Sequence, residues 1–183
     1  YVGRWVTPPF NARRFDTWFF LVKCPPKQEP NVIAGELQRG EWRTARGAYG
    51  RWMNDLVVAV PPTLHALRTL AAGITPDLVD RFLSIPEAHG QPERRITFRP
   101  NYICFPVRTP TRPPATHTCC YIVHNSKELL VFDPGSPYEV EQQALAECID
   151  DMIAEGRRVR EIILTHLHPD HVGGVTALKD HLG

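Results

Sequence analysis

The sequence has 183 residues, of which 43% are hydrophobic and 22% are charged, and its formal net charge is +1. This composition is ordinary for a globular protein, and the balanced charge excludes a strong field that would attract nucleic acid or an anionic membrane. Since no run of eighteen apolar residues and no signal-peptide pattern occurs, we expect a cytoplasmic protein without a membrane span.

The first region, residues 1–86, is predicted to contain one strand and two helices. Aromatic and β-branched residues favour a strand at 14–22, which ends at a Cys-Pro-Pro sequence because proline cannot continue a ladder. Apolar residues at spacings of three and four predict helices over 41–52 and 61–72. The second helix opens on proline and ends at Gly73, a typical C-terminal capping residue.

The second region, residues 96–183, follows a polar stretch at 87–95 that we interpret as a linker. Ser136 and Glu139 fit a capping box for a helix whose apolar stripe runs to Ile153. Short apolar runs predict strands at 96–98, 102–105, 118–123, 129–132 and 159–164. The strand at 159–164 is apolar on both faces, so we expect it to be fully buried.

The cysteines do not form a disulfide framework. Their number is odd and no CxxC spacing occurs, so we expect buried free thiols in a reducing compartment. Cys119 and Cys120 are neighbours in a predicted strand and should point to opposite faces. The five cysteines are Cys24, Cys104, Cys119, Cys120 and Cys148.

A cluster of metal-binding side chains follows the strand at 159–164. Three imidazoles and one carboxylate, the groups that zinc and neighbouring metals prefer, lie within six residues: His166, His168, Asp170 and His171. Four side chains from one short loop cannot all reach a single ion in tetrahedral geometry. Two ions roughly 3.5–4 Å apart could instead divide the four side chains between them and share a hydroxide. The isolated histidines are interpreted as surface or structural residues, namely His65, His89, His117, His124 and His181.

The stretch 165–174 resembles the HxHxDH signature of the metallo-β-lactamase superfamily. The sequence Asp133-Pro134-Gly135, after a predicted hairpin, is similar to that family's strand-end motif. The resemblance covers 96–183 and implies the N-terminal half of an αββα sandwich. It implies that one or two zinc ions, or iron, are held by His166, His168, Asp170 and His171. It also gives Asp170 a catalytic role and makes Asp133 a structural support of the metal loop.

Enzymes of this family take further ligands from later in the chain: a third histidine, a bridging aspartate and a final histidine. We expect these residues beyond Gly183, so that the sequence is a fragment of a longer protein.

Residues 1–86 resemble the C-terminal part of a Nudix hydrolase, with the coenzyme A diphosphatase-like branch the most similar. The resemblance is carried by residues 8–22, Gly35-Glu36, Glu41-Trp42 and the helix that starts at Pro61. The glutamate-rich Nudix box is absent and would lie before Tyr1, so no catalysis is assigned here. The predicted fold class is therefore α/β (α+β): a partial αββα metallo-β-lactamase sandwich preceded by part of a Nudix-like α/β/α domain.

The resemblance implies a metal-dependent hydrolase that uses a metal-activated hydroxide on a small-molecule or nucleotide-type substrate. Thioesters, phosphodiesters and lactams all remain open as substrates. One alternative is a mononuclear iron enzyme similar to persulfide dioxygenases. The flavin–diiron branch fits less well, because it tends to have glutamate where His168 stands. A third possibility is a non-catalytic Nudix-like binding module fused to a hydrolase. No nucleic-acid signature is found, no membrane partner is expected, and no oligomeric state is predicted.

Overall fold

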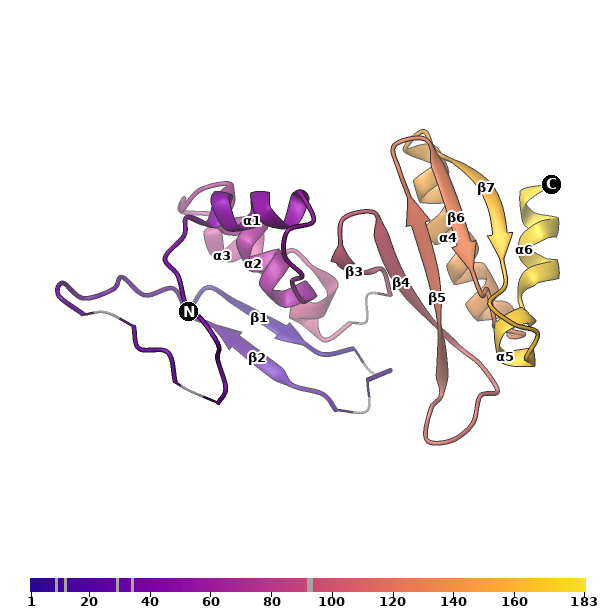
Figure 1. Cartoon of the computed structure of the whole chain (residues 1–183), viewed down its shortest axis with the longest axis horizontal. Coiled ribbons are helices and arrows are strands. Elements are labelled where there is room, and N and C mark those ends of the chain that lie inside the picture. The colour runs from indigo at the N-terminus through magenta and orange to yellow at the C-terminus, as the bar shows by residue number, and fades with distance from the viewer. Residues whose placement is uncertain (9, 12, 29, 34, 92–93) are drawn as a thin grey trace. The chain divides into compact units, whose positions relative to one another are not determined.

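The computed structural model describes residues 1–8, 10–11, 13–28, 30–33, 35–91 and 94–183. The chain divides into two compact units (Figure 1): unit 1 comprises residues 1–8 and 13–92, and unit 2 comprises 9–12 and 93–183. Positions 9 and 12 of the Nudix-like segment and positions 92 and 93 of the predicted linker lie outside the described residues. Over the described ranges, no helix is both long and apolar enough to cross a membrane.

Unit 1 contains a two-stranded antiparallel sheet and three short α-helices over its described residues. β1 (Gly3–Val6) pairs with β2 (Asp16–Phe19). The strand predicted at 14–22 is therefore shorter than expected, and its partner β1 was not predicted. The helices are α1 (Ala45–Met53), α2 (Pro61–Ala71) and α3 (Leu78–Leu83), followed by the 3₁₀ turn η1 (Pro86–His89).

Local chemistry explains how the two predicted helices begin. The Thr44 hydroxyl accepts a hydrogen bond from the backbone N–H of Gly47, so α1 begins four residues later than predicted. α2 begins with prolines in its first turn, where no N–H is needed, as predicted. α3 was missed because six residues are too few to show helical periodicity. The stretch predicted as a polar linker starts inside η1, where Glu87 and Ala88 are buried.

Unit 2 is built on a five-stranded sheet in the order β3-β4-β5-β6-β7. The strands are β3 (Ile96–Arg99), β4 (Tyr102–Arg108), β5 (His117–His124), β6 (Glu128–Phe132) and β7 (Arg158–Ile163). Adjacent strands are antiparallel except β6 and β7, which run parallel and are joined by α4 (Glu139–Ala154). Two helices follow β7: α5 (Pro169–Val172) and α6 (Val175–Leu182). The mixed α/β architecture predicted for this region is confirmed.

The core of unit 2 lies between the sheet and the helices α4 and α6 (Figure 1). Alternate residues of the central strands point to this side because strand side chains alternate between faces. The fully buried members include Val107, Ile122, Val131 and Ile149. Each buried aliphatic side chain of this size contributes roughly 1.5–3 kcal/mol relative to exposure. This core fixes the two parallel strands that carry the site.

Two predictions in this region are wrong. β7 lies at the edge of the sheet, and Arg158, Arg160 and Glu161 on it are exposed, so the strand is not fully buried. Ser136 does not form a capping box, because α4 begins only at Glu139. Instead, the Ser136 hydroxyl donates to the carbonyl oxygen of Arg108 at 2.6 Å, which ties the approach to α4 to the end of β4.

The cysteines follow the sheet geometry. Cys120 is fully buried in the core, whereas its neighbour Cys119 is exposed on the other face, as strand alternation predicts. Cys104 and Cys148 are also buried, while Cys24 is exposed. All five are free thiols. The prediction of burial is therefore wrong for Cys24 and Cys119.

Candidate metal centre

The predicted metal loop lies where the two parallel strands end. Because β6 and β7 run in the same direction, their carboxyl ends meet at one edge of the sheet, where ligands collect in open α/β layers. Asp133 directly follows β6, and its backbone N–H donates to the carbonyl oxygen of Ile163 at 3.0 Å. Its φ of 50° is in the left-handed region, which aspartate tolerates better than most residues. This turn directs the Asp133 side chain toward Thr165.

The buried carboxylate of Asp133 connects the two strand ends. Oδ1 accepts from the backbone N–H of Thr165 at 2.8 Å, and Oδ2 accepts from the Thr165 hydroxyl at 2.6 Å and faces His171 Nδ1 at 2.9 Å. Burial alone would raise the pKa of Asp133, but the bonds from Thr165 and His171 outweigh it and hold that pKa below its ordinary value. Asp133 is therefore ionised at neutral pH and acts only as an acceptor.

The ionised Asp133 determines which nitrogen of each imidazole carries a proton. His171 Nδ1 must donate to the carboxylate, which leaves the lone pair of His171 Nε2 available. The Thr165 hydroxyl gives its one proton to Asp133, so it accepts from His166 Nδ1 at 3.0 Å. His166 Nε2 then carries no proton, and its lone pair faces His168 Nδ1. One carboxylate thus prepares two histidines for binding a cation.

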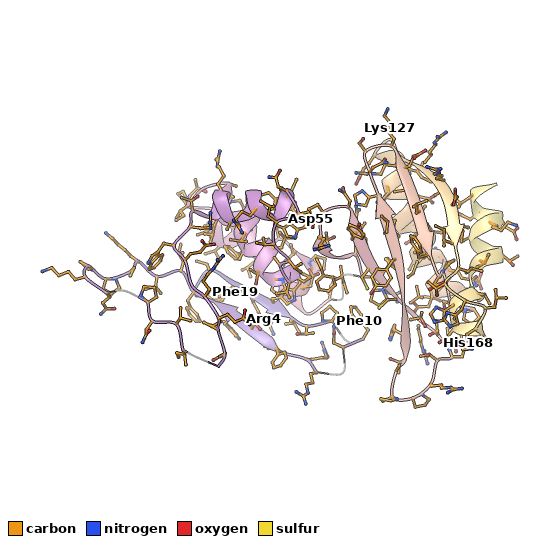
Figure 2. The ribbon with its side chains drawn as sticks, viewed as in Figure 1. Arg4, Phe10, Phe19, Asp55, Lys127 and His168 are labelled. Atoms are coloured by element: carbon orange, nitrogen blue, oxygen red, sulfur yellow. The ribbon has the colours of Figure 1, made fainter. Side chains whose placement is uncertain are left out.

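The three histidine rings gather at this end of the sheet. His166 Nε2 and His168 Nδ1 face each other at 3.0 Å. The ring centroid of His166 is 4.5 Å from that of His168 and 4.0 Å from that of His171. Figure 2 shows His168 at the end of the sheet opposite Lys127, which lies in the β5–β6 turn. The residues predicted from sequence spacing are therefore brought together.

Asp170 joins the cluster from the first turn of α5, for which His168 is the N-cap residue. Its Oδ2 lies 4.0 Å from His171 Nε2. A hydrogen bond from the Thr111 side chain is the largest influence on Asp170 and, with the nearby histidines, lowers the pKa of its carboxyl despite an opposing contribution from desolvation. Asp170 is consequently an anion at neutral pH, facing the imidazoles.

Glycines let the loop after β6 touch the backbone of the metal loop. A Cβ on Gly135 would lie 1.9 Å from the backbone oxygen of Asp170, and a Cβ on Gly174 would lie 2.5 Å from the oxygen of Pro134. The backbone N–H of Gly174 donates to that same Pro134 oxygen at 2.7 Å. Any larger side chain at position 135 would push the metal loop away from Asp133.

The donor set fits a zinc-type ion. Two nitrogens bound to one tetrahedral zinc at about 2.0–2.1 Å lie roughly 3.3–3.4 Å apart, close to the 3.0 Å between His166 Nε2 and His168 Nδ1. In the structure these two nitrogens share a hydrogen bond, and their proton occupies the space that a cation would take. No group of three or more His, Cys, Asp or Glu side chains within the described ranges is already arranged around one point.

The supporting roles of Thr165, Thr111 and Gly135 were not predicted from the sequence. Thr165 stands next to the predicted strand end, and its position after β7 was the available signal. Thr111 lies 59 residues before Asp170 in the chain, so no local spacing could relate the two. The contact between Gly135 and Asp170 depends on parallel pairing of β6 and β7, which the motif itself does not encode.

Comparison with known families agrees with this geometry. Residues 114–183 match the family model described as the metallo-beta-lactamase superfamily. This match confirms the resemblance predicted from the HxHxDH stretch over most of 96–183.

Two curated relatives match over 71 residues, which are 39% of this chain. A hydroxyacylglutathione hydrolase of Albidiferax ferrireducens is 35% identical. A protein of the same name from Aeromonas salmonicida is 37% identical. The chain spans about a quarter of the length of these relatives, since the matched part covers 25% of each. The Nudix-like assignment of residues 1–86 and the domain limits stay predictions.

Proposed function

We propose that unit 2 holds one or two zinc ions through His166, His168, Asp170 and His171, and that the protein containing this chain is a metal-dependent hydrolase. The observation that carries the proposal is the hydrogen-bond relay from Asp133, which leaves the Nε2 lone pairs of His166 and His171 available beside an ionised Asp170. Partners of this kind orient metal-binding histidines and raise their basicity.

Each residue has a distinct role in this proposal. His166 and His168 hold one ion between their facing nitrogens, and Asp170 and His171 hold a second. Asp133 orients His171 directly and His166 through Thr165. A bound metal ion lowers the pKa of its water to about 7, which supplies hydroxide at neutral pH. Asp170 contributes its negative charge next to the reacting bond, the catalytic role predicted for it.

For the substrate we propose a small molecule with an acyl thioester bond. The relatives that match this region are called hydroxyacylglutathione hydrolases, a name that describes cleavage of an acyl group from a thiol. A nucleotide-type phosphodiester is the second candidate; it rests on the Nudix-like resemblance of residues 1–86. We also propose a cytoplasmic location, in keeping with free thiols at all five cysteines.

The direct test measures zinc binding by the chain with His168→Ala beside His181→Ala. His181 is a matched control because it lies in unit 2 but pairs with Asp150, away from the metal loop. We expect the His168 variant to lose most of its zinc affinity and the His181 variant to keep it. Equal affinities in both variants would overturn the proposed site.

Activity is then tested on the protein loaded with zinc or with ferrous iron. Hydrolysis of an acyl thioester by the zinc form, abolished by His168→Ala, supports the thioester proposal. Cleavage of a phosphodiester alone would transfer the assignment to the second substrate. Binding of one ferrous ion in preference to zinc, with uptake of oxygen, would favour the persulfide dioxygenase alternative.

A further inference from the structure

The loop between β4 and β5 reaches the metal loop from a distant part of the sequence. A cavity of about 450 Å³ separates the two loops, and it is lined by Pro110, Thr111, Arg112, His168, Pro169 and Asp170. Side chains from residues 110–112 therefore face the same space as two of the proposed metal ligands. In Figure 1 this loop and α5 lie at the same end of the sheet.

The base of this loop is fixed by hydrogen bonds. The backbone N–H of Thr109 donates to the carbonyl oxygen of Thr116 at 3.2 Å, and the buried hydroxyls of Thr109 and Thr118 are 2.8 Å apart. Within the loop, the backbone N–H of Ala115 donates to the carbonyl oxygen of Arg112 at 3.1 Å. Prolines at three of the loop positions further restrict its backbone. Arg112 is thus presented to the cavity from a well-defined base.

Arg112 differs from two other arginines of unit 2, Arg94 and Arg108, in the partners of its guanidinium group. The Arg94 guanidinium forms two hydrogen bonds with Glu141, at 2.6 and 3.0 Å, and Arg108 lies 5.6 Å from the centroid of the Tyr138 ring. Arg112 is exposed and forms no ion pair with the part of the chain that the structure describes. The carboxylate that shares its cavity, Asp170, instead accepts a hydrogen bond from Thr111.

We propose that Arg112 is a specificity-determining residue that binds an oxyanion of the substrate, a carboxylate or a phosphate, while the bond to be hydrolysed lies beside His168 and Asp170. A guanidinium binds either oxyanion through two parallel hydrogen bonds, which fixes orientation as well as position. This inference rests on the proposed function, because it assigns a substrate class to the same site. It selects anionic substrates over neutral ones of the same shape.

The first test measures anion binding rather than activity. Inorganic phosphate and acetate are titrated separately into the zinc-free and the zinc-loaded chain, and binding is followed by NMR. Arg112→Gln should weaken binding of the preferred anion about tenfold, and Arg112→Lys should weaken it less, because lysine keeps the charge but loses the bidentate geometry. Arg160→Gln is the matched control. Arg160 lies exposed on β7, and its substitution removes the same charge from unit 2. Zinc affinity should be equal in all four proteins.

The second test compares a thioester that carries a free carboxylate with its methyl ester. Arg112→Gln should raise KM for the carboxylate form about tenfold with little change in kcat, and should leave the ester unaffected, because the lost interaction is to the anion alone. Where phosphate rather than acetate is the preferred anion, a phosphorylated thioester and its neutral analogue take their place.

The results separate this inference from the proposed function. A wild-type protein that binds no zinc, or hydrolyses none of the substrates, would refute the proposed function. If anion binding still depended on Arg112 in that protein, the oxyanion site would be retained. Anion affinities that are equal in wild type and Arg112→Gln would overturn the inference, as would a wild type that binds neither anion. An equal change in KM for the charged and neutral thioesters would also overturn it.

Discussion

Units 1 and 2 have similar lengths but differ in how their strands are supported. In unit 2, five strands share a continuous core with α4 and α6, and several of its side chains are completely buried. In the described part of unit 1, the sheet has two strands, and Trp18 of β2 is 57% exposed, with further aromatic side chains exposed around it. A two-stranded sheet is marginally stable unless other elements cover it. The candidate site therefore lies on the unit whose core can hold it rigidly.

The largest expected effect comes from the core of unit 2. Ile149→Ala removes a completely buried side chain of α4 and should lower the free energy of unfolding of unit 2 by about 3–4 kcal/mol, through lost burial and the cavity that remains. Ile74→Ala in unit 1, where the side chain is 70% exposed, should change stability by less than about 0.5 kcal/mol. Denaturant unfolding with hydrogen exchange measures the change in free energy of unfolding in each variant. Similar losses of stability in the two variants would show that the two units do not differ in this way.

A pair of glycines tests the backbone contact between the two loops of the site. Gly135→Ala should cost about 2–3 kcal/mol, since the new Cβ would lie 1.9 Å from the Asp170 backbone oxygen. Gly50→Ala in α1 of unit 1 meets no atom within 4 Å and should stabilise that helix by about 0.5–1 kcal/mol. Thermal unfolding distinguishes the two changes. A Gly135→Ala variant as stable as wild type would show that the loops do not touch.

Asp133→Asn tests the hydrogen-bond relay from the Asp133 carboxylate to His166 and His171. Asparagine keeps the shape but loses the negative charge that fixes the protons of His166 and His171, so zinc affinity should fall about 10–100-fold. Asp80→Asn on α3 of unit 1 is the control and should leave zinc affinity unchanged, because Asp80 is exposed and belongs to the unit that does not carry the candidate ligands. Competition with a chelating dye gives both affinities, and an unchanged value for Asp133→Asn would exclude the relay.

The smallest expected effect is a pH dependence in unit 2. Burial, together with the charge of Arg157, lowers the pKa of His124, whose Nδ1 is buried and has no hydrogen-bond partner in the described ranges. The neutral form is therefore favoured in the folded protein. Stability should be complete above the ordinary histidine value near 6.5 and should decline as the pH falls through the lower folded-state pKa. His124→Leu should make this decline shallower in unfolding curves between pH 7 and 5. An unaltered slope would contradict the assignment.

The sequence predicted the elements of unit 2 better than those of unit 1. Strands β4 to β7 and helix α4 are long or have a clear spacing of apolar residues, and this spacing was sufficient to predict them. In unit 1, β1 and α3 have four and six residues, too few for periodicity to appear. The burial of β7 was overestimated because its apolar residues suggested two neighbouring strands, whereas the strand has one and carries charged side chains on its exposed positions.

The four candidate ligands could all be proposed from the sequence, because they lie within six residues and local spacing suffices to find them. The surrounding residues depend on tertiary structure. Thr111 and Arg112 reach the cavity through a hairpin loop, and Gly135 reaches Asp170 through the parallel pairing of β6 and β7. Ser136 was wrongly predicted to be a helix cap. Its hydroxyl instead bonds to the carbonyl oxygen of Arg108, which is 28 residues away in the sequence, so no local pattern could indicate this partner.

In the proposed site, the imidazoles of the metal loop bind zinc with protonation states set by Asp133. Long-range nitrogen–proton NMR of the histidine rings, recorded before and after addition of zinc, measures both the protonation states and the binding. We predict that His166 and His171 carry the proton on Nδ1 before zinc is added, and that their Nε2 resonances shift on zinc binding while those of His181 do not. Ring resonances of His166 and His171 that are unaffected by zinc would exclude these two histidines as zinc ligands.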